Sequence, residues 1–192
     1  LPIVMEIAAK HHAEVLLSEL LRSAFPADLV VSHYFRQHRE LGHADRGFVA
    51  ETVFAVLRRK RSLSARCAGD LSSRRLLLAA LTCVQGLNLR QLDGMLGEAE
   101  NKWLAHAKAV KMEDLPSAVR LDLPDWLHDE LLAQLPVDDV EKLAAALNQP
   151  APLDLPVNSL KAGRREVLAR LQSDGLAAEA CPFSPLGIRL AG

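Results

Sequence analysis

The sequence predicts a mainly α-helical protein that ends in a small α+β segment. Leucine and alanine, two strong helix formers, supply much of the 49% hydrophobic content, whereas aromatic residues make up only 4%. The sequence pattern changes at "NQPAPLDLP", residues 148–156, where Pro150 and Pro152 prevent the chain from continuing as a helix. At 192 residues the chain has room for two small domains. We therefore expect a helical bundle over residues 1–148 and the start of a separate α+β unit over residues 149–192.

The spacing of apolar residues predicts the helices of the bundle. The first helix has an i, i+3, i+4, i+7 stripe and ends near Phe25. The stripe consists of Ala13, Leu16, Leu17, Leu20 and Ala24. Pro26 suits the first turn of a second helix that Gly42 ends, and Asp45 is the predicted N-cap of a third. The third helix has its core face at Val49, Val53, Val56 and Leu57. Further helices are expected at about 72–84, 88–96, 98–110, 124–135 and 137–148.

The segment after the prolines has the pattern β-α-β-β. Apolar and polar residues alternate over 153–157, which predicts a strand, and Pro156 restricts that strand to a sheet edge. A helix over 164–174 stops at Gly175, and two further short strands are expected at 177–181 and 187–190. One helix on such a small sheet leaves apolar surface uncovered, so we expect this segment to be the beginning of a larger unit.

Several classes of protein and site are disfavoured. The longest apolar run, 76–84, is too short to span a bilayer, and no secretion signal precedes it, so a cytoplasmic protein is expected. Cys67, Cys83 and Cys181 stand too far apart to suggest a disulfide framework or a zinc site. Cys83 is expected in the core, and Cys67 would be reactive only if its thiol were exposed beside Arg66.

The histidines do not have the spacing of a metal site on one helix. His33, His38 and His43 are spaced by five, which rotates each by about 140° from the last, and the adjacent His11 and His12 point apart. The sequence therefore predicts no metal. Trp103 and Trp126 are expected to anchor helix packing rather than to stack on bases.

Charge is segregated along the chain although the net charge is only −1. Residues 56–90 have a local balance of +7 and residues 112–145 a balance of −7. This asymmetry suggests a basic face for a polyanion, with the acidic residues held away from it. The alternative is that the two segments attract each other within the fold.

The basic residues supply the candidates for phosphate contacts, which position nucleic acid without reading its sequence. On a helix, the side chains of residues 58–61 are spread over about 300° around the axis, so only some of them can contact one nucleic-acid backbone. We expect Lys60, Arg61 and Arg66 to line up with Arg74 and Arg75. A second group stands at the start of the helix over 164–174, where positive charge opposes the helix dipole. The full set is Arg58, Arg59, Lys60, Arg61, Arg66, Arg74, Arg75, Lys161, Arg164 and Arg165.

Motifs over most of the chain resemble the Sun/Fmu family of RNA (cytosine-C5)-methyltransferases, of RsmB-like type. In the family a helix ending in Asn leads through a Pro-rich hinge to Arg-Val-Asn-Thr-Leu-Lys, a Glu-containing helix, Gly and a Ser-Pro-x-Gly-x-Arg-Leu strand. The matching residues here are Asn148, Pro150, Val157, Asn158, Ser159, Leu160, Lys161, Glu166, Gly175, Ser184, Pro185, Gly187, Arg189 and Leu190. Nearer the N-terminus the matches are Leu41, Gly42, Asp45, Arg46, Phe48, Leu57, Arg58 and Arg59, and "LPDWL" at 123–127 is similar to a family Pro-x-Trp-Leu signature. Pro156 stands where the family usually has Arg.

The resemblance implies a NusB-like RNA-binding bundle up to residue 148, followed by the start of an RRM-like subdomain. In the family, a domain that binds S-adenosylmethionine follows and methylates a cytosine of 16S ribosomal RNA through a cysteine thiolate. The family's catalytic Cys motifs and its Gly-rich cofactor loop have no match here. The chain is therefore expected to be an N-terminal fragment that recognises ribosomal RNA, is inactive alone and binds no cofactor itself. The alternative is a stand-alone NusB-like module acting in antitermination or ribosome assembly, which the segment after residue 148 disfavours.

Overall fold

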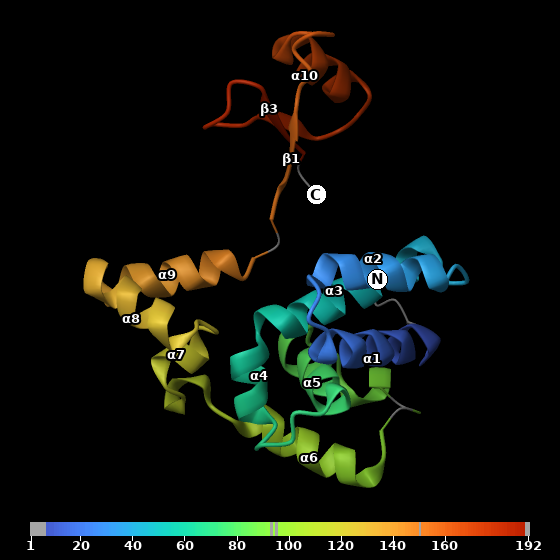
Figure 1. Cartoon of the computed structure of the whole chain (residues 1–192), viewed down its shortest axis with the longest axis vertical. Coiled ribbons are helices and arrows are strands. Elements are labelled where there is room, and N and C mark those ends of the chain that lie inside the picture. Colours follow the sequence, from blue (N-terminus) through green and yellow to red (C-terminus); the bar gives the residue numbers. More distant parts are fainter. Residues whose placement is uncertain (1–6, 93, 95, 150, 191–192) are drawn as a thin grey trace. The chain divides into compact units, whose positions relative to one another are not determined.

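The computed structural model describes residues 7–92, 94, 96–149 and 151–190 (Figure 1). Contacts divide the chain into two compact units, residues 1–148 and 149–192, and each unit is described by itself. The first is helical and the second contains a small antiparallel sheet with one helix. The predicted fold class, mainly α with a small α+β segment, is confirmed.

The main core of the helical unit is enclosed by its first five helices. They are α1 (Ile7–Arg22), α2 (Ala27–Gln37), α3 (His43–Arg58), α4 (Lys60–Arg66) and α5 (Ser73–Ala79). Helix α1 lies against α3 and α5, where Leu16, Val53 and Leu77 are fully buried (Figure 1). Cys67 is buried in the same core, and burial raises the pKa of its thiol to about 11, so Cys67 is not a reactive thiol.

Helix α5 runs directly into a π-helical turn, η1 (Ala80–Val84). Residues 76–81 are all fully buried, as expected of a helix that is apolar on every side. The Thr82 hydroxyl donates to the Leu78 carbonyl oxygen over 2.8 Å, which satisfies a buried polar group within the helix. The predicted helix over 72–84 is therefore the central element of the core, and Cys83 is only half-buried at its end.

The remaining helices follow in the chain; the first of them pack on the main core, and the last two enclose a second, smaller core. In order, the remaining helices are η2 (Leu89–Leu92), α6 (Glu98–Ala109), η3 (Met112–Asp114), α7 (Ser117–Arg120), α8 (Asp125–Gln134) and α9 (Val137–Leu147). A proline stands directly before each of α7, α8 and α9, where the chain enters the helix in extended geometry. Leu123, Val140 and Ala144 form the small core between α8 and α9.

Four expectations about this unit are wrong. The second helix ends at Gln37 and not at Gly42. Gly42, not Asp45, occupies the N-cap of α3, and Asp45 lies in the first turn, where its carboxylate favours the helix dipole. Among the described residues of the predicted helix over 88–96, only the short 3₁₀ turn η2 is helical. Trp126 is 71% exposed, because the packed side of α8 is formed by Leu127 and Leu131 and Trp126 is rotated about 100° from that stripe. Trp103 does pack against the main core, as predicted.

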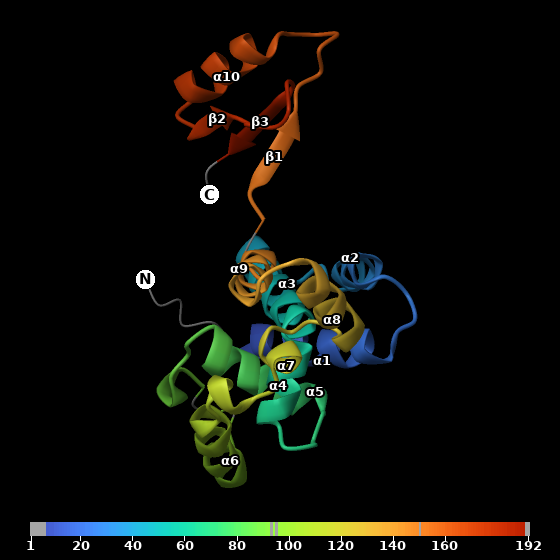
Figure 2. The same cartoon turned by 90° about the vertical axis from the view of Figure 1, so that its left-hand side faces the viewer.

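The second unit has strands β1 (Leu153–Pro156), β2 (Ala178–Ala180) and β3 (Gly187–Leu190) and helix α10 (Arg164–Ser173). The strands are antiparallel in the order β1-β3-β2, and α10 packs on β2 and β3 (Figure 2). Pro156 pairs with Gly187 on the edge strand β1, as its missing amide hydrogen requires. Leu155, Leu160 and Phe183 are exposed, so much apolar surface of this unit is uncovered, as predicted.

Gly187 is the point of closest packing in the second unit. A Cβ added at this position would lie 2.8 Å from Cys181 Sγ and 2.9 Å from Cys181 Cβ. Cys181 and Ile188 are buried beside it. The glycine of the Ser-Pro-x-Gly-x-Arg-Leu motif is therefore required by the close approach of the loop that contains Cys181.

Candidate nucleic-acid interface

The basic segment of α4 is bound to the acidic segment that precedes α8. Asp122 adopts a left-handed backbone conformation, with φ of 57°, that directs its carboxylate at the start of α4. One carboxylate oxygen accepts from the Ser62 backbone amide over 2.8 Å and the other from the Ser62 hydroxyl over 2.7 Å. Burial raises the pKa of Asp122, and these hydrogen bonds partly oppose the rise. Asp122 thus caps α4 from a distant part of the chain.

Arg61 strengthens the same junction. Its guanidinium donates to the Leu123 carbonyl oxygen and forms an ion pair of 2.7 Å with Asp125. Arg59 donates to the carbonyl oxygen of Asn148 over 3.4 Å, at the end of α9. Both arginines therefore hold the second core to α4, and the Arg61–Asp125 ion pair joins the basic segment to the acidic one, as the alternative of mutual attraction predicts.

Arg66 binds the end of α6. Its guanidinium donates to the carbonyl oxygens of Ala107 over 2.7 Å and Val110 over 3.1 Å. These carbonyls would otherwise lack partners, and the positive charge lies at the negative end of the helix dipole. Arg66 is therefore engaged in holding α6 against α4.

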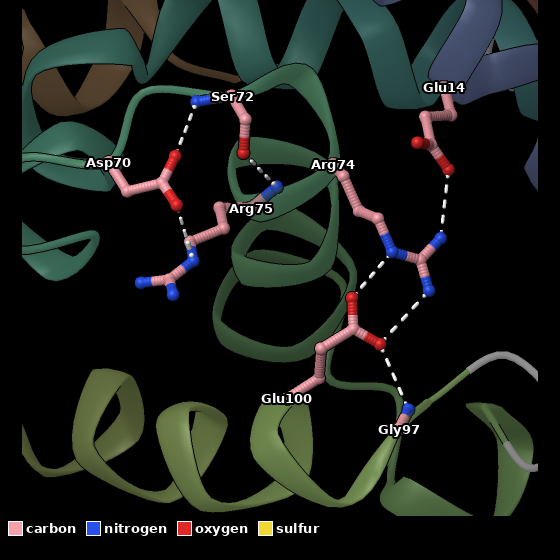
Figure 3. Close-up of polar contacts among 7 residues, drawn as sticks. All are labelled: Glu14, Asp70, Ser72, Arg74, Arg75, Gly97 and Glu100. Carbon is pink, nitrogen blue, oxygen red and sulfur yellow. Dashed lines mark hydrogen bonds and ion pairs between the residues drawn. The ribbon is translucent and has the colours of Figure 1, made fainter.

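Arg74 is at the centre of an ion-pair cluster (Figure 3). Its guanidinium contacts Glu14 at 2.9 Å and both carboxylate oxygens of Glu100, at 2.5 and 3.0 Å. Glu100 also accepts from the Gly97 backbone amide over 3.0 Å, at the start of α6. The Arg74 hydrogen bonds, more than any other contact, lower the pKa of Glu100. The cluster links α1, α5 and α6.

Arg75 points in another direction, as Figure 3 shows. It pairs with Asp70 at 2.9 Å, and its guanidinium carbon lies 4.9 Å from the centre of the Trp103 ring. The stacking covers Trp103 and directs the arginine along the protein surface. Arg74 and Arg75 are therefore both bound to other side chains of the helical unit.

Arg58 and Lys60 differ from these arginines. Both side chains are exposed at the junction of α3 and α4, and within the described part of the chain neither has a hydrogen bond or an ion pair. Lys108 and Lys111, beside the carbonyls that Arg66 binds, are exposed as well. The charge count over 56–90 missed these two lysines because only the packing of α4 against α6 brings them near that segment.

The candidates of the second unit divide in the same way. Arg164 donates to the Ser184 carbonyl oxygen over 2.8 Å, which fixes the loop before β3. Lys161 and Arg165 are exposed at the start of α10, without a hydrogen bond or an ion pair to any residue that the structure describes. Arg189 pairs with Asp154 across β1 and β3, with two contacts of 2.8 Å. Among the described residues of this unit, Lys161 and Arg165 near the start of α10 and Arg170 in its last turn are thus the exposed cationic side chains without such a partner.

The structure reveals no helix long and apolar enough to cross a membrane among its described residues.

Comparisons with known proteins agree with the family motifs. A model of the ferredoxin-like domain of RsmF/B-like methyltransferases matches residues 123–192. A probable ribosomal RNA small subunit methyltransferase B of Synechocystis is 26% identical over 97% of this chain. The chain spans 49% of the length of that relative.

A solved structure, titled "Crystal Structure of PH0851", has the same fold, with a TM-score of 0.56 at 15% identity. The match covers 98% of this chain and 49% of that one. The family model and the Synechocystis relative confirm the resemblance to Sun/Fmu-type methyltransferases that the sequence motifs predicted, and the solved structure supports the fold.

Proposed function

We propose that this chain is the RNA-recognition region of an S-adenosylmethionine-dependent ribosomal RNA (cytosine-C5)-methyltransferase. The observation that carries the proposal is the match of residues 123–192 to a domain of RsmF/B-like methyltransferases, in a chain similar over 97% of its length to a probable small subunit methyltransferase B. In this proposal the NusB-like helical unit and the unit that contains the sheet hold ribosomal RNA, and a catalytic domain supplies the cofactor site and the nucleophilic cysteine.

The hydrogen bonds and ion pairs of the basic residues support a narrower set of candidates for the proposed RNA contacts. Arg59, Arg61, Arg66, Arg74, Arg75 and Arg164 bind partners within their own unit. Using them for phosphates would require breaking those contacts. Arg58 and Lys60 in the helical unit, and Lys161 and Arg165 in the second unit, can bind phosphate without that cost. We assign the RNA contacts to these exposed side chains, with Lys108 and Lys111 as additions.

Charge reversal at Arg58 and Lys60 tests the assignment. The double variant R58E/K60E is expected to bind a small-subunit ribosomal RNA fragment at least tenfold more weakly in low salt, because each lost phosphate contact removes counterion release. The slope of log affinity against log salt should fall by about 1.4–1.8 for two contacts. Filter binding over a range of salt concentrations measures both quantities.

The double variant K102E/K142E is the matched control. It changes the net charge by the same amount, but each of these lysines lies in a local surface ion pair, with Glu98 or with Asp139. It should bind almost as well as the unmodified chain, since the effect is assigned to position and not to total charge. Equal weakening by both double variants would remove Arg58 and Lys60 as the specific contacts.

The methyltransferase assignment has a separate test. The reading frame downstream of Gly192 is expected to encode a Gly-rich cofactor loop and a Pro-Cys motif within about 200 residues, on the scale of a typical domain. The 192-residue chain alone should transfer no methyl group from S-adenosylmethionine to ribosomal RNA. A frame without either motif, together with intact RNA binding, would instead favour a stand-alone NusB-like module in antitermination or ribosome assembly.

A further inference from the structure

The fold brings together two histidines and a carboxylate that are separated along the sequence. His12 lies on α1, His38 follows the last turn of α2, and Glu40 lies in the loop before α3. His38 Nδ1 is 2.8 Å from Glu40 Oε1, and His12 Nε2 is 4.0 Å from the same oxygen. One donor atom from each residue lies within 4.8 Å of the other two. Sequence spacing could not reveal this group, because its members come from different elements.

We propose that His12, His38 and Glu40 form a binding site for a divalent transition metal ion, with Zn²⁺ as the ion that fits best. A tetrahedral zinc ion with nitrogen and oxygen ligands keeps its donor atoms about 3.3–3.5 Å apart. The distances from Glu40 Oε1 to the two histidine nitrogens, 2.8 and 4.0 Å, lie on either side of that value. The ion would replace the proton that lies between His38 and Glu40. Small rotations of the three side chains would then bring their donor atoms to the separations of a tetrahedral site. Water would occupy the fourth position.

The surrounding residues already orient the ligands. His12 Nδ1 is 2.8 Å from the Tyr34 hydroxyl, which leaves Nε2 directed toward Glu40. Ligating histidines commonly hold their second ring nitrogen in such a hydrogen bond. The ring of Tyr34 also packs on the ring of His38, with centres 4.1 Å apart. Tyr34 is fully buried, so it fixes both histidines from one rigid position.

The loop that contains Glu40 is fixed as well. Arg46 on α3 donates to the Leu41 carbonyl oxygen over 2.9 Å and to the His38 carbonyl oxygen over 3.2 Å. The backbone on both sides of Glu40 is therefore held by the same guanidinium. The donor set of two imidazoles and one carboxylate suits Zn²⁺ and its neighbours in the first transition series, and disfavours Ca²⁺ or Mg²⁺, which prefer oxygen ligands.

Calorimetric titration of the whole 192-residue chain with ZnCl₂ tests the site. The chain is expected to bind one Zn²⁺, and H12Q, H38Q and E40Q should each weaken binding at least tenfold. Y34F should weaken it about tenfold, as loss of an orienting hydrogen bond does. Glu40 is largely exposed, so E40Q keeps the test valid if a histidine variant fails to fold. Titration with Co²⁺ should give a visible absorption band typical of a tetrahedral site.

Exposed histidines and the thiols supply the controls. His33 and His43 lie outside the group and are exposed, so H33Q and H43Q should bind Zn²⁺ like the unmodified chain. Cys83 is the cysteine that is not buried, and C83S should also bind normally. Absence of saturable binding, or equal loss in H33Q and E40Q, or loss in C83S alone, would overturn the proposal.

Discussion

The helical unit and the unit that contains the sheet reach their folds by different means. The main core of the first is built on a helix whose residues 76–81 are all fully buried, surrounded by further apolar side chains of α1 and α3. Among the described residues of the second unit, burial is confined to Cys181, Gly187 and Ile188. Its strands are joined by backbone pairing and by the Arg189–Asp154 ion pair. Apolar burial therefore dominates one unit, and close backbone packing matters more in the other.

The largest expected effect is loss of apolar volume in the main core. Leu77→Ala should lower the free energy of unfolding by about 2–5 kcal/mol, because a fully buried leucine leaves a cavity. Urea unfolding followed by tryptophan fluorescence measures this, since Trp103 and Trp126 both lie in the helical unit. Leu29→Ala is the control. Because Leu29 is largely exposed on α2, this substitution should lower the free energy of unfolding much less. Similar losses in the two variants would contradict a core dominated by burial.

A smaller effect is expected from crowding the second unit. Gly187→Ala should destabilise that unit by about 1–3 kcal/mol, because the new methyl group would lie within 3.0 Å of both Cys181 and Ser184 side-chain atoms. The readout is alkylation of Cys181, followed by mass spectrometry, which should become faster when its packing is lost.

Gly163→Ala is the matched glycine control for that experiment. Nothing lies within 4 Å of the position that its Cβ would occupy, and its φ is −78°. The variant should leave the alkylation of Cys181 unchanged. If G163A and G187A gave the same rate, close packing at Gly187 would not explain the stability of this unit.

The smallest expected effect concerns the Arg74 cluster, and it depends on pH. Arg74→Gln should cost about 1–2 kcal/mol at pH 7, less than the leucine variant, because the ion pairs are partly exposed. Arg74 lowers the pKa of Glu100 in the folded state, so this stabilisation is present above the ordinary pKa of glutamate. It is lost as the pH falls through the lowered folded-state value.

Unfolding of the unmodified chain and of R74Q at pH 7 and pH 4 measures that dependence. The difference between the two chains should shrink at the lower pH. R74K keeps the positive charge but not the paired hydrogen bonds. Its free energy of unfolding should therefore lie between those of the unmodified chain and R74Q. A difference that stays constant with pH would mean that packing, and not charge, explains the role of Arg74.

Helix periodicity and proline positions predicted most elements, because both are local properties of the chain. The strands, α10 and the edge position of Pro156 followed from alternation and from the missing amide hydrogen. Trp126 could not be placed in the same way, since its exposure depends on which side of α8 meets α9. Gly42 displaced Asp45 as the N-cap because the α3 helix begins earlier than its apolar stripe.

The candidate interface was harder to predict than the fold. Charge along the sequence identified where cations are concentrated, but their partners come from segments up to 89 residues away, as for Arg59 and Asn148. Which arginines bind carbonyls or carboxylates, and which remain exposed, is a tertiary property. The group of His12, His38 and Glu40 was missed for the same reason.

The capping of α4 by Asp122 has a consequence for local opening. Helices α7, α8 and α9 share only a small core of their own and are tied to α4 largely by polar contacts of Asp122 and Arg61. Regions with little apolar burial open at lower free energy than the main core. The last helices of the bundle are therefore expected to open locally at a lower free energy than the core of α1, α3 and α5, and loss of the Asp122 capping contacts should lower that free energy further.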